Sequence, residues 1–141
     1  MAEATLVVTR LEPDGLLLVL QSAHRDSPMR DTTHTDAKWH RKLKKSLRKF
    51  RECLVGFHQD ERKLAVIGQE LFRDIVPPAM RAEIRKLRVS LEVQTDETSI
   101  PWEILHDGDD FLATRLALSR KTFRTTYAAA HTGQSPGSLY W

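Results

Sequence analysis

The spacing of apolar residues changes period twice along this chain, and the order of these changes limits the folds that it can adopt. Residues 5–10 and 16–22 are rich in strand-forming residues and flank Glu12-Pro13-Asp14-Gly15, a sequence typical of a turn. They predict a β-hairpin. The polar residues 23–35, with Ser27-Pro28 and paired threonines, predict a loop.

Between residues 36 and 87 apolar residues recur every three or four positions, which is the spacing of helices. Val55-Gly56-Phe57 predicts a break between two antiparallel helices, and Pro77-Pro78 predicts the end of the second and the start of a short third. The predicted apolar faces consist of Trp39, Leu43, Leu47, Phe50 and Leu54, then Leu64, Ile67, Leu71 and Ile75, then Met80, Ile84 and Leu87.

Residues 88–93 return to a period of two, so Val89, Leu91 and Val93 are expected to face inward. The order of periods predicts an α/β (α+β) fold, in which a small mixed or antiparallel sheet begins with a hairpin and carries two to three helices on one face. We expect one domain over residues 1–127 and a flexible tail over residues 128–141, which are rich in Ala, Gly, Ser and Pro.

The composition sets limits on the environment and the chemistry of the chain. With 141 residues, 40% of them hydrophobic, it can form one packed core. The single cysteine excludes an internal disulfide and suits a reducing cytoplasm. The longest apolar run, residues 16–20, is far shorter than the roughly 20 residues of a membrane span, so no membrane association is expected. We expect no cofactor.

Residues 99–120, SIPWEILHDGDDFLATRLALSR, combine a helix start with a sharp turn. Pro101 suits the first position of a helix because it has no N–H to lose, and Trp102 supplies a large apolar side chain directly after it. Asp107-Gly108 is expected to stop this helix and turn the chain. A spacing of two then predicts a half-buried strand or hairpin with Leu112, Thr114, Leu116 and Leu118.

This segment resembles the PWE-L-L-x-D-G…F-L-A…R segment in the non-catalytic N-terminal part of the CHAT domain. CHAT domains form a family of caspase-like cysteine proteases that are often linked to helical repeats or to bacterial defence. The resemblance covers roughly residues 60–120, including residues 68–78 and 88–93, and it implies that Trp102 and Glu103 clamp this region against the protease core. The matching positions are Pro101, Trp102, Glu103, Leu105, Asp107, Gly108, Phe111, Leu112, Ala113 and Arg120.

The catalytic residues of that family are missing from this sequence. None of its six histidines lies between glycines after an apolar strand, and Cys53 precedes the matching segment instead of following it. The resemblance therefore implies a non-catalytic module of a CHAT-type protease, or a stand-alone accessory protein of such a system. Such a module would bind a caspase-like core or another component, or would self-associate through partly uncovered faces of Val89, Leu91, Val93, Leu112, Leu116 and Leu118.

A basic helix suggests an alternative function. Residues 38–51 contain eight cations and no acid: Lys38, Arg41, Lys42, Lys44, Lys45, Arg48, Lys49 and Arg51. The simpler interpretation is a solvated face opposite an apolar stripe that packs on the sheet. Otherwise the helix defines a small binding protein for an acidic partner or a nucleic acid. A protein partner is favoured, because no aromatic residues for base stacking interrupt the charged face.

Two smaller groups of residues have alternative interpretations. Cys53 lies near several cations that could favour its thiolate, but its place beside the apolar stripe favours a small buried hydrophobic residue. His106 with Asp107, Asp109 and Asp110 offers donors that could bind a metal ion. The remaining ligands of a calcium loop are absent, which favours a solvated turn and no metal site.

Overall fold

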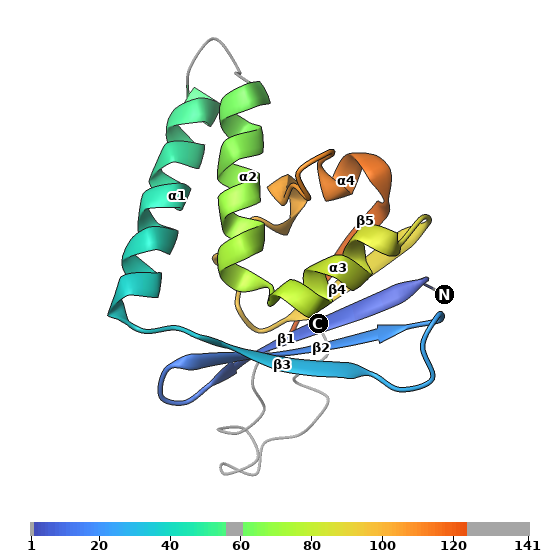
Figure 1. Cartoon of the computed structure of the whole chain (residues 1–141). Coiled ribbons are helices and arrows are strands. Elements are labelled where there is room, and N and C mark those ends of the chain that lie inside the picture. Colours follow the sequence, from blue (N-terminus) through green and yellow to red (C-terminus); the bar gives the residue numbers. More distant parts are fainter. Residues whose placement is uncertain (1, 56–60, 124–141) are drawn as a thin grey trace.

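The computed structural model describes residues 2–55 and 61–123, in which a five-stranded sheet carries all the helices on one of its faces (Figure 1). The strand order is β3-β2-β1-β4-β5. Strands β1, β2 and β3 are antiparallel neighbours, whereas β4 and β5 run parallel to β1, so the sheet is mixed. This confirms the expected α+β fold. The strands are β1 (Ala4–Leu11), β2 (Gly15–Ser22), β3 (Met29–His34), β4 (Ser90–Thr95) and β5 (Ala117–Thr122).

Helices form the second layer, and their order agrees with the helical periodicity of the sequence. Figure 1 shows the first two side by side and antiparallel. Pro78 is the first residue of the third helix, where its missing N–H costs no hydrogen bond. The helical elements are α1 (Ala37–Val55), α2 (Glu61–Ile75), α3 (Pro78–Lys86), the 3₁₀ turn η1 (Trp102–Ile104) and α4 (Leu112–Arg115). The expected break at residues 56–57 and the expected tail over residues 128–141 lie outside the described residues.

The core lies between the helices and one face of the sheet. Leu6 of β1 stands opposite Leu20 of β2 and Val93 of β4, so every second residue of these strands points toward the helices. Helices α2 and α3, with Leu87 directly after α3, cover this face with buried residues from the predicted stripes. These are Ile67, Leu71, Ile75, Met80, Ile84 and Leu87, all nearly inaccessible to solvent.

The prediction of a loop over residues 23–35 is wrong, because Met29–His34 forms β3. This strand lies at the edge of the sheet and pairs with β2 from Met29 to His34. Its side chains are mostly exposed and polar, so no apolar alternation marks it in the sequence. The backbone of β2, together with a hydrogen bond of 2.6 Å from Thr33 Oγ1 to the carbonyl of Ile75, holds it in place.

The inward orientation predicted for Val89 is also wrong, since its side chain is 67% exposed. Strand β4 begins one residue later, and its inward residues are Leu91, Val93 and Thr95. The N–H groups of residues 88–90 are held by the carboxylate of Glu3, which keeps this segment out of the regular alternation.

The strand predicted through Leu112 and Thr114 is instead the single helical turn of α4, and β5 starts at Ala117. Leu116 donates its N–H to the carbonyl of Leu112 at 2.8 Å, the contact of a helix. Leu112 and Leu116 are four residues apart, and this spacing fits both a helix and a strand. Both are buried, so the uncovered apolar face expected there is not found.

Candidate functional site

The Pro101 segment forms a short turn that places Trp102 in the core. Pro101 precedes η1, and the N–H of Ile104 donates to its carbonyl at 3.1 Å. The turn ends when Leu105 donates its N–H to the carbonyl of Trp102 at 3.2 Å. The helix predicted here is therefore a single 3₁₀ turn, which ends before Asp107-Gly108.

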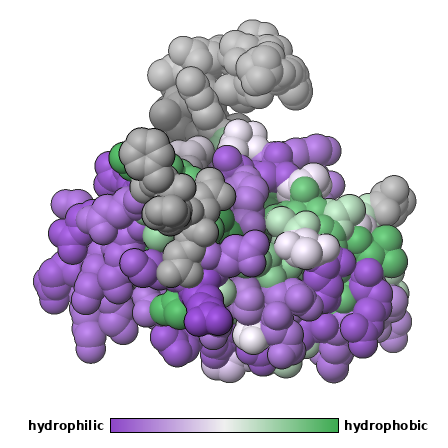
Figure 2. Space-filling model, turned by 90° about the horizontal axis from the view of Figure 1, so that it is seen from above, coloured by the Kyte–Doolittle hydropathy of each residue, from purple (hydrophilic) through white to green (hydrophobic). Residues whose placement is uncertain are grey.

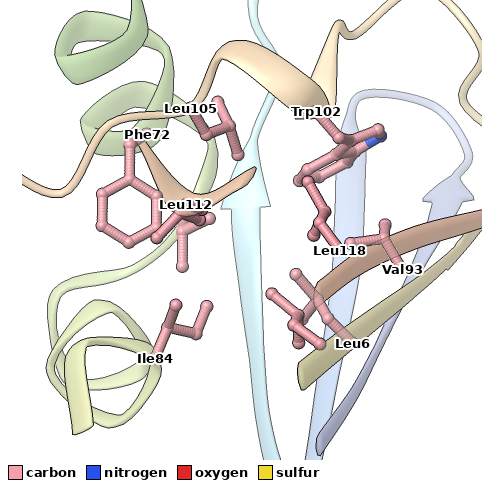
Figure 3. Close-up of a pocket in the computed structure, with 10 residues that line it drawn as sticks. Leu6, Phe72, Ile84, Val93, Trp102, Leu105, Leu112 and Leu118 are labelled. Atoms are coloured by element: carbon pink, nitrogen blue, oxygen red, sulfur yellow. The ribbon is translucent and has the colours of Figure 1, made fainter. Parts of the chain in front are cut away.

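Trp102 is 1% exposed and lies at the centre of the apolar layer of this chain, so its side chain is not free to clamp the region against a separate protease core, as the resemblance implied. Figure 3 shows it above Leu118 and Val93 of the sheet, across from Phe72 and Leu105. These side chains leave no space large enough for a water molecule. The indole Nε1 is buried and finds no acceptor within the described residues. Trp102 therefore stabilises this region by packing alone.

Two further matching positions, Glu103 and Arg120, connect the turn to β5. Arg120 Nε lies 3.6 Å from Glu103 Oε1, and its NH1 donates to the carbonyl of Ile100 at 3.1 Å. Both side chains are partly exposed, so the ion pair contributes little to stability. The contacts of Arg120 hold β5 against the segment that carries Trp102.

Asp107 organises the turn that follows. Its Oδ1 accepts the N–H groups of Asp109 and Asp110, both at 2.9 Å, and its own N–H donates to the carbonyl of Asp110 at 3.0 Å. Gly108 has a φ of 103°, a conformation that side chains other than hydrogen rarely permit. His106 Nδ1 accepts the N–H of Gly108 at 3.0 Å. The predicted turn at Asp107-Gly108 is confirmed.

The carboxylate of Asp107 is buried rather than solvated, which corrects that prediction. Its Oδ2 lies 3.1 Å from both Nε and NH2 of Arg115. Arg115 also donates to the carbonyls of Ile84 and Leu87 at the end of α3. Burial alone would raise the pKa of Asp107, but the N–H groups of Asp110 and Asp109 and the Arg115 guanidinium lower it below its ordinary value. Both carboxylate oxygens are therefore engaged inside the protein.

Arg115 was not identified from the sequence. It stands eight residues after Asp107, outside the spacing of a helical pair, and its contacts with α3 join segments about 30 residues apart. No group of three or more His, Cys, Asp or Glu residues in the described ranges could hold a metal ion. Cys53 has a free thiol and is half-buried against the core.

Helix α1 is only partly covered by the rest of the fold. Asp36 starts it by accepting the N–H of Trp39 at 2.8 Å, and the indole of Trp39 donates to the carbonyl of Asp74 at 2.9 Å. Leu47 is half-buried and Leu54 is 53% exposed, so the apolar stripe extends beyond the contact with α2. Figure 2 shows a largely hydrophilic surface on the side where α1 lies. Seven of its eight lysine and arginine side chains are exposed, and Lys49 is half-buried.

Within the described segments, no helix combines the length and the apolar character needed to cross a membrane. Comparisons with known proteins find no match to this chain among family models, curated sequences or solved structures.

Proposed function

We propose that this chain is a non-catalytic N-terminal module of a CHAT-type, caspase-like protease, or a stand-alone accessory protein of such a system. It acts in the cytoplasm by binding another protein. The observation that supports this most directly is the edge strand β5, which runs parallel to its neighbour β4. The motif residue Arg120 lies on this strand and pairs with Glu103.

Among residues 2–55 and 61–123, the outer edge of β5 has backbone groups that pair with no other strand. Ala117 donates its N–H to the carbonyl of Val89 at 2.9 Å and so faces β4. Alternation along the strand directs the N–H groups of Leu118, Arg120 and Thr122 the other way, where no described strand pairs with them. An edge of this kind is a template for another strand. It replaces the expected apolar faces as the proposed contact surface, because Leu91, Val93, Leu112 and Leu116 are buried.

The orientation of β5 favours one kind of partner. Strands β1, β4 and β5 are mutually parallel. Parallel strands usually lie inside a larger sheet whose two faces are covered, and not at an exposed edge. A caspase-like core has the parallel strands that would continue this sheet. The side chains of β5 leave the edge accessible, because Lys121 lies 3.3 Å from Glu92 on β4 and Arg120 turns back toward Glu103. Pairing of β5 with a second copy of the chain is the self-association alternative.

A proline substitution in β5 tests this proposal. Thr122→Pro removes an outward N–H while leaving the pairing with β4 intact, and Thr122→Val is its matched control. The chain is co-expressed with the His- and Cys-bearing caspase-like protein encoded beside it. We expect the two proteins to elute as one complex, which Thr122→Val retains and Thr122→Pro loses.

The proposal fails if neither the downstream reading frame nor a neighbouring gene encodes such a core, or if no complex forms. It also fails if Thr122→Pro, folded as judged by circular dichroism, still binds as the wild type does. Light scattering of the chain alone reports the competing outcome, a dimer that Thr122→Pro dissociates.

A further inference from the structure

Helix α1 borders an open groove with leucine on its wall and cations on its rim. The groove has a volume of about 540 Å³, and the residues that line it come from the first half of α1 and from the segment after β4. Leu43 and Leu47 are its apolar wall and Arg41 and Lys44 its charged rim, while Ser99 comes from the segment after β4. The groove shares no residue with the outer edge of β5.

A shallow basic surface adjoins this groove along α1. Five side chains line it: Arg41, Lys44, Lys45, Arg48 and Arg51. At 100° per residue, Lys44, Arg48 and Arg51 lie within about 100° of Leu47 around the helix, on the side of the groove. Glu52 is the one acid in α1, and no carboxylate of the described segments forms an ion pair with these five cations.

We propose that this surface binds an acidic amphipathic helix of a partner protein. Leu43 and Leu47 are four residues apart and form a seam for the apolar face of such a helix. The neighbouring cations then meet glutamate or aspartate at its flanks, as charged flanking positions do in a coiled coil. The surface from His40 to Arg51 is about 17 Å long at 1.5 Å per residue, enough for three turns of the partner.

The leucine wall favours a helix over a nucleic acid. A phosphate backbone would pair with the cations but would leave Leu43 and Leu47 exposed, whereas an amphipathic helix buries the leucines and pairs with the cations. Trp39 is buried and its indole is bonded to Asp74, so it offers no ring on which bases could stack.

Binding of synthetic peptides tests this inference. The probe is a helical peptide of three heptads with leucine at positions a and d and glutamate at e and g. The matched peptide has lysine in place of every glutamate. Titration followed by fluorescence anisotropy should show binding of the glutamate peptide, and binding of the lysine peptide at least tenfold weaker.

Variants of α1 locate the site on the helix. We expect Leu47→Gln, which removes apolar contact, and the double variant Lys44→Glu/Arg48→Glu each to weaken binding of the glutamate peptide about tenfold or more. The control Lys38→Glu/Lys42→Glu makes the same change in net charge at the same spacing on the other flank of α1. It should change affinity by no more than about twofold to threefold.

Several outcomes would overturn the inference. These are no binding of the glutamate peptide, equal binding of the lysine peptide, equal losses in the two charge-reversed doubles, or no effect of Leu47→Gln in a folded variant. A DNA duplex that binds more tightly than the glutamate peptide would assign the surface to nucleic acid instead.

Discussion

Replacing Glu3 by glutamine should destabilise the protein in a manner that depends on pH. Glu3 Oε1 accepts the N–H groups of Arg88, Val89 and Ser90 at 2.9, 2.7 and 3.3 Å, and its Oε2 lies 2.6 Å from His24 Nε2. The hydrogen bond with His24, followed by those with the backbone, lowers the pKa of Glu3 from 4.5 to about 2, although burial opposes this. Glu3 therefore attaches the beginning of β1 to the beginning of β4.

The size of the effect follows from this pKa. At about 1.4 kcal/mol per pKa unit, the shift sets an upper limit near 3.5 kcal/mol, and solvent screening around the exposed His24 ring reduces the expected loss to about 1–2 kcal/mol. The carboxylate is stabilising when it is ionised. Its contribution is complete above the unfolded-state pKa near 4.5 and is lost as the pH falls through about 2.

Urea unfolding at neutral pH and at several pH values down to about 2 measures this contribution. We expect the difference in unfolding free energy between the wild type and Glu3→Gln to be about 1–2 kcal/mol at pH 7 and to shrink toward zero as the pH approaches 2. Glu12→Gln, at an exposed carboxylate between β1 and β2, should change stability by less than about 0.5 kcal/mol. A difference for Glu3→Gln that is absent at pH 7, or that does not vary with pH, would refute the reasoning.

Three other substitutions test the packing around the Pro101 segment, each by chemical denaturation. Gly68→Ala would place its Cβ 2.0 Å from the carbonyl oxygen of Ile104, so we expect a loss of about 1–3 kcal/mol, and unchanged stability would contradict the close approach of α2. Trp102→Ala should cost about 3–5 kcal/mol and Trp102→Phe much less, because the indole N–H donates to no residue that the structure describes; equal losses would refute this. Arg115→Met should cost about 3 kcal/mol by leaving Asp107 buried without its cation, and adding Asp107→Asn should restore part of it. No recovery in that double variant would show that the ion pair is not the cause.

The elements that the sequence predicted correctly are those whose signals are local. The hairpin of β1 and β2 has alternating strands around a turn sequence, and the helices have periodic apolar faces with prolines at the start of α3. Strand β3 was missed because an edge strand with polar side chains leaves no periodic signal. Leu112 and Leu116 were assigned to a strand because a spacing of four residues occurs on one face of a helix and of a strand alike. The 2.8 Å hydrogen bond from the N–H of Leu116 to the carbonyl of Leu112 shows that the segment is helical.

In the candidate site too, the features with local signals were predictable and those that depend on distant contacts were not. The burial of Trp102 and the turn at Asp107-Gly108 were predictable, because a large apolar residue and a turn pair carry their own signals. The roles of Glu3 and Arg115 were not, since their partners lie far away in sequence and depend on the assembled fold. An arginine shortly after an Asp-Gly turn is the one local hint that could have suggested the contact between Arg115 and Asp107.

Amide hydrogen exchange along β5, measured by NMR with and without the caspase-like partner, tests the proposed contact most directly. In the chain alone, the N–H groups of Arg120 and Thr122 should exchange rapidly, and those of Ser119 and Lys121, which face β4, should be protected. Addition of the partner should slow exchange at Arg120 and Thr122 by an order of magnitude or more. Unchanged exchange at these two residues in a formed complex would contradict the account, because the partner would then bind elsewhere on the molecule.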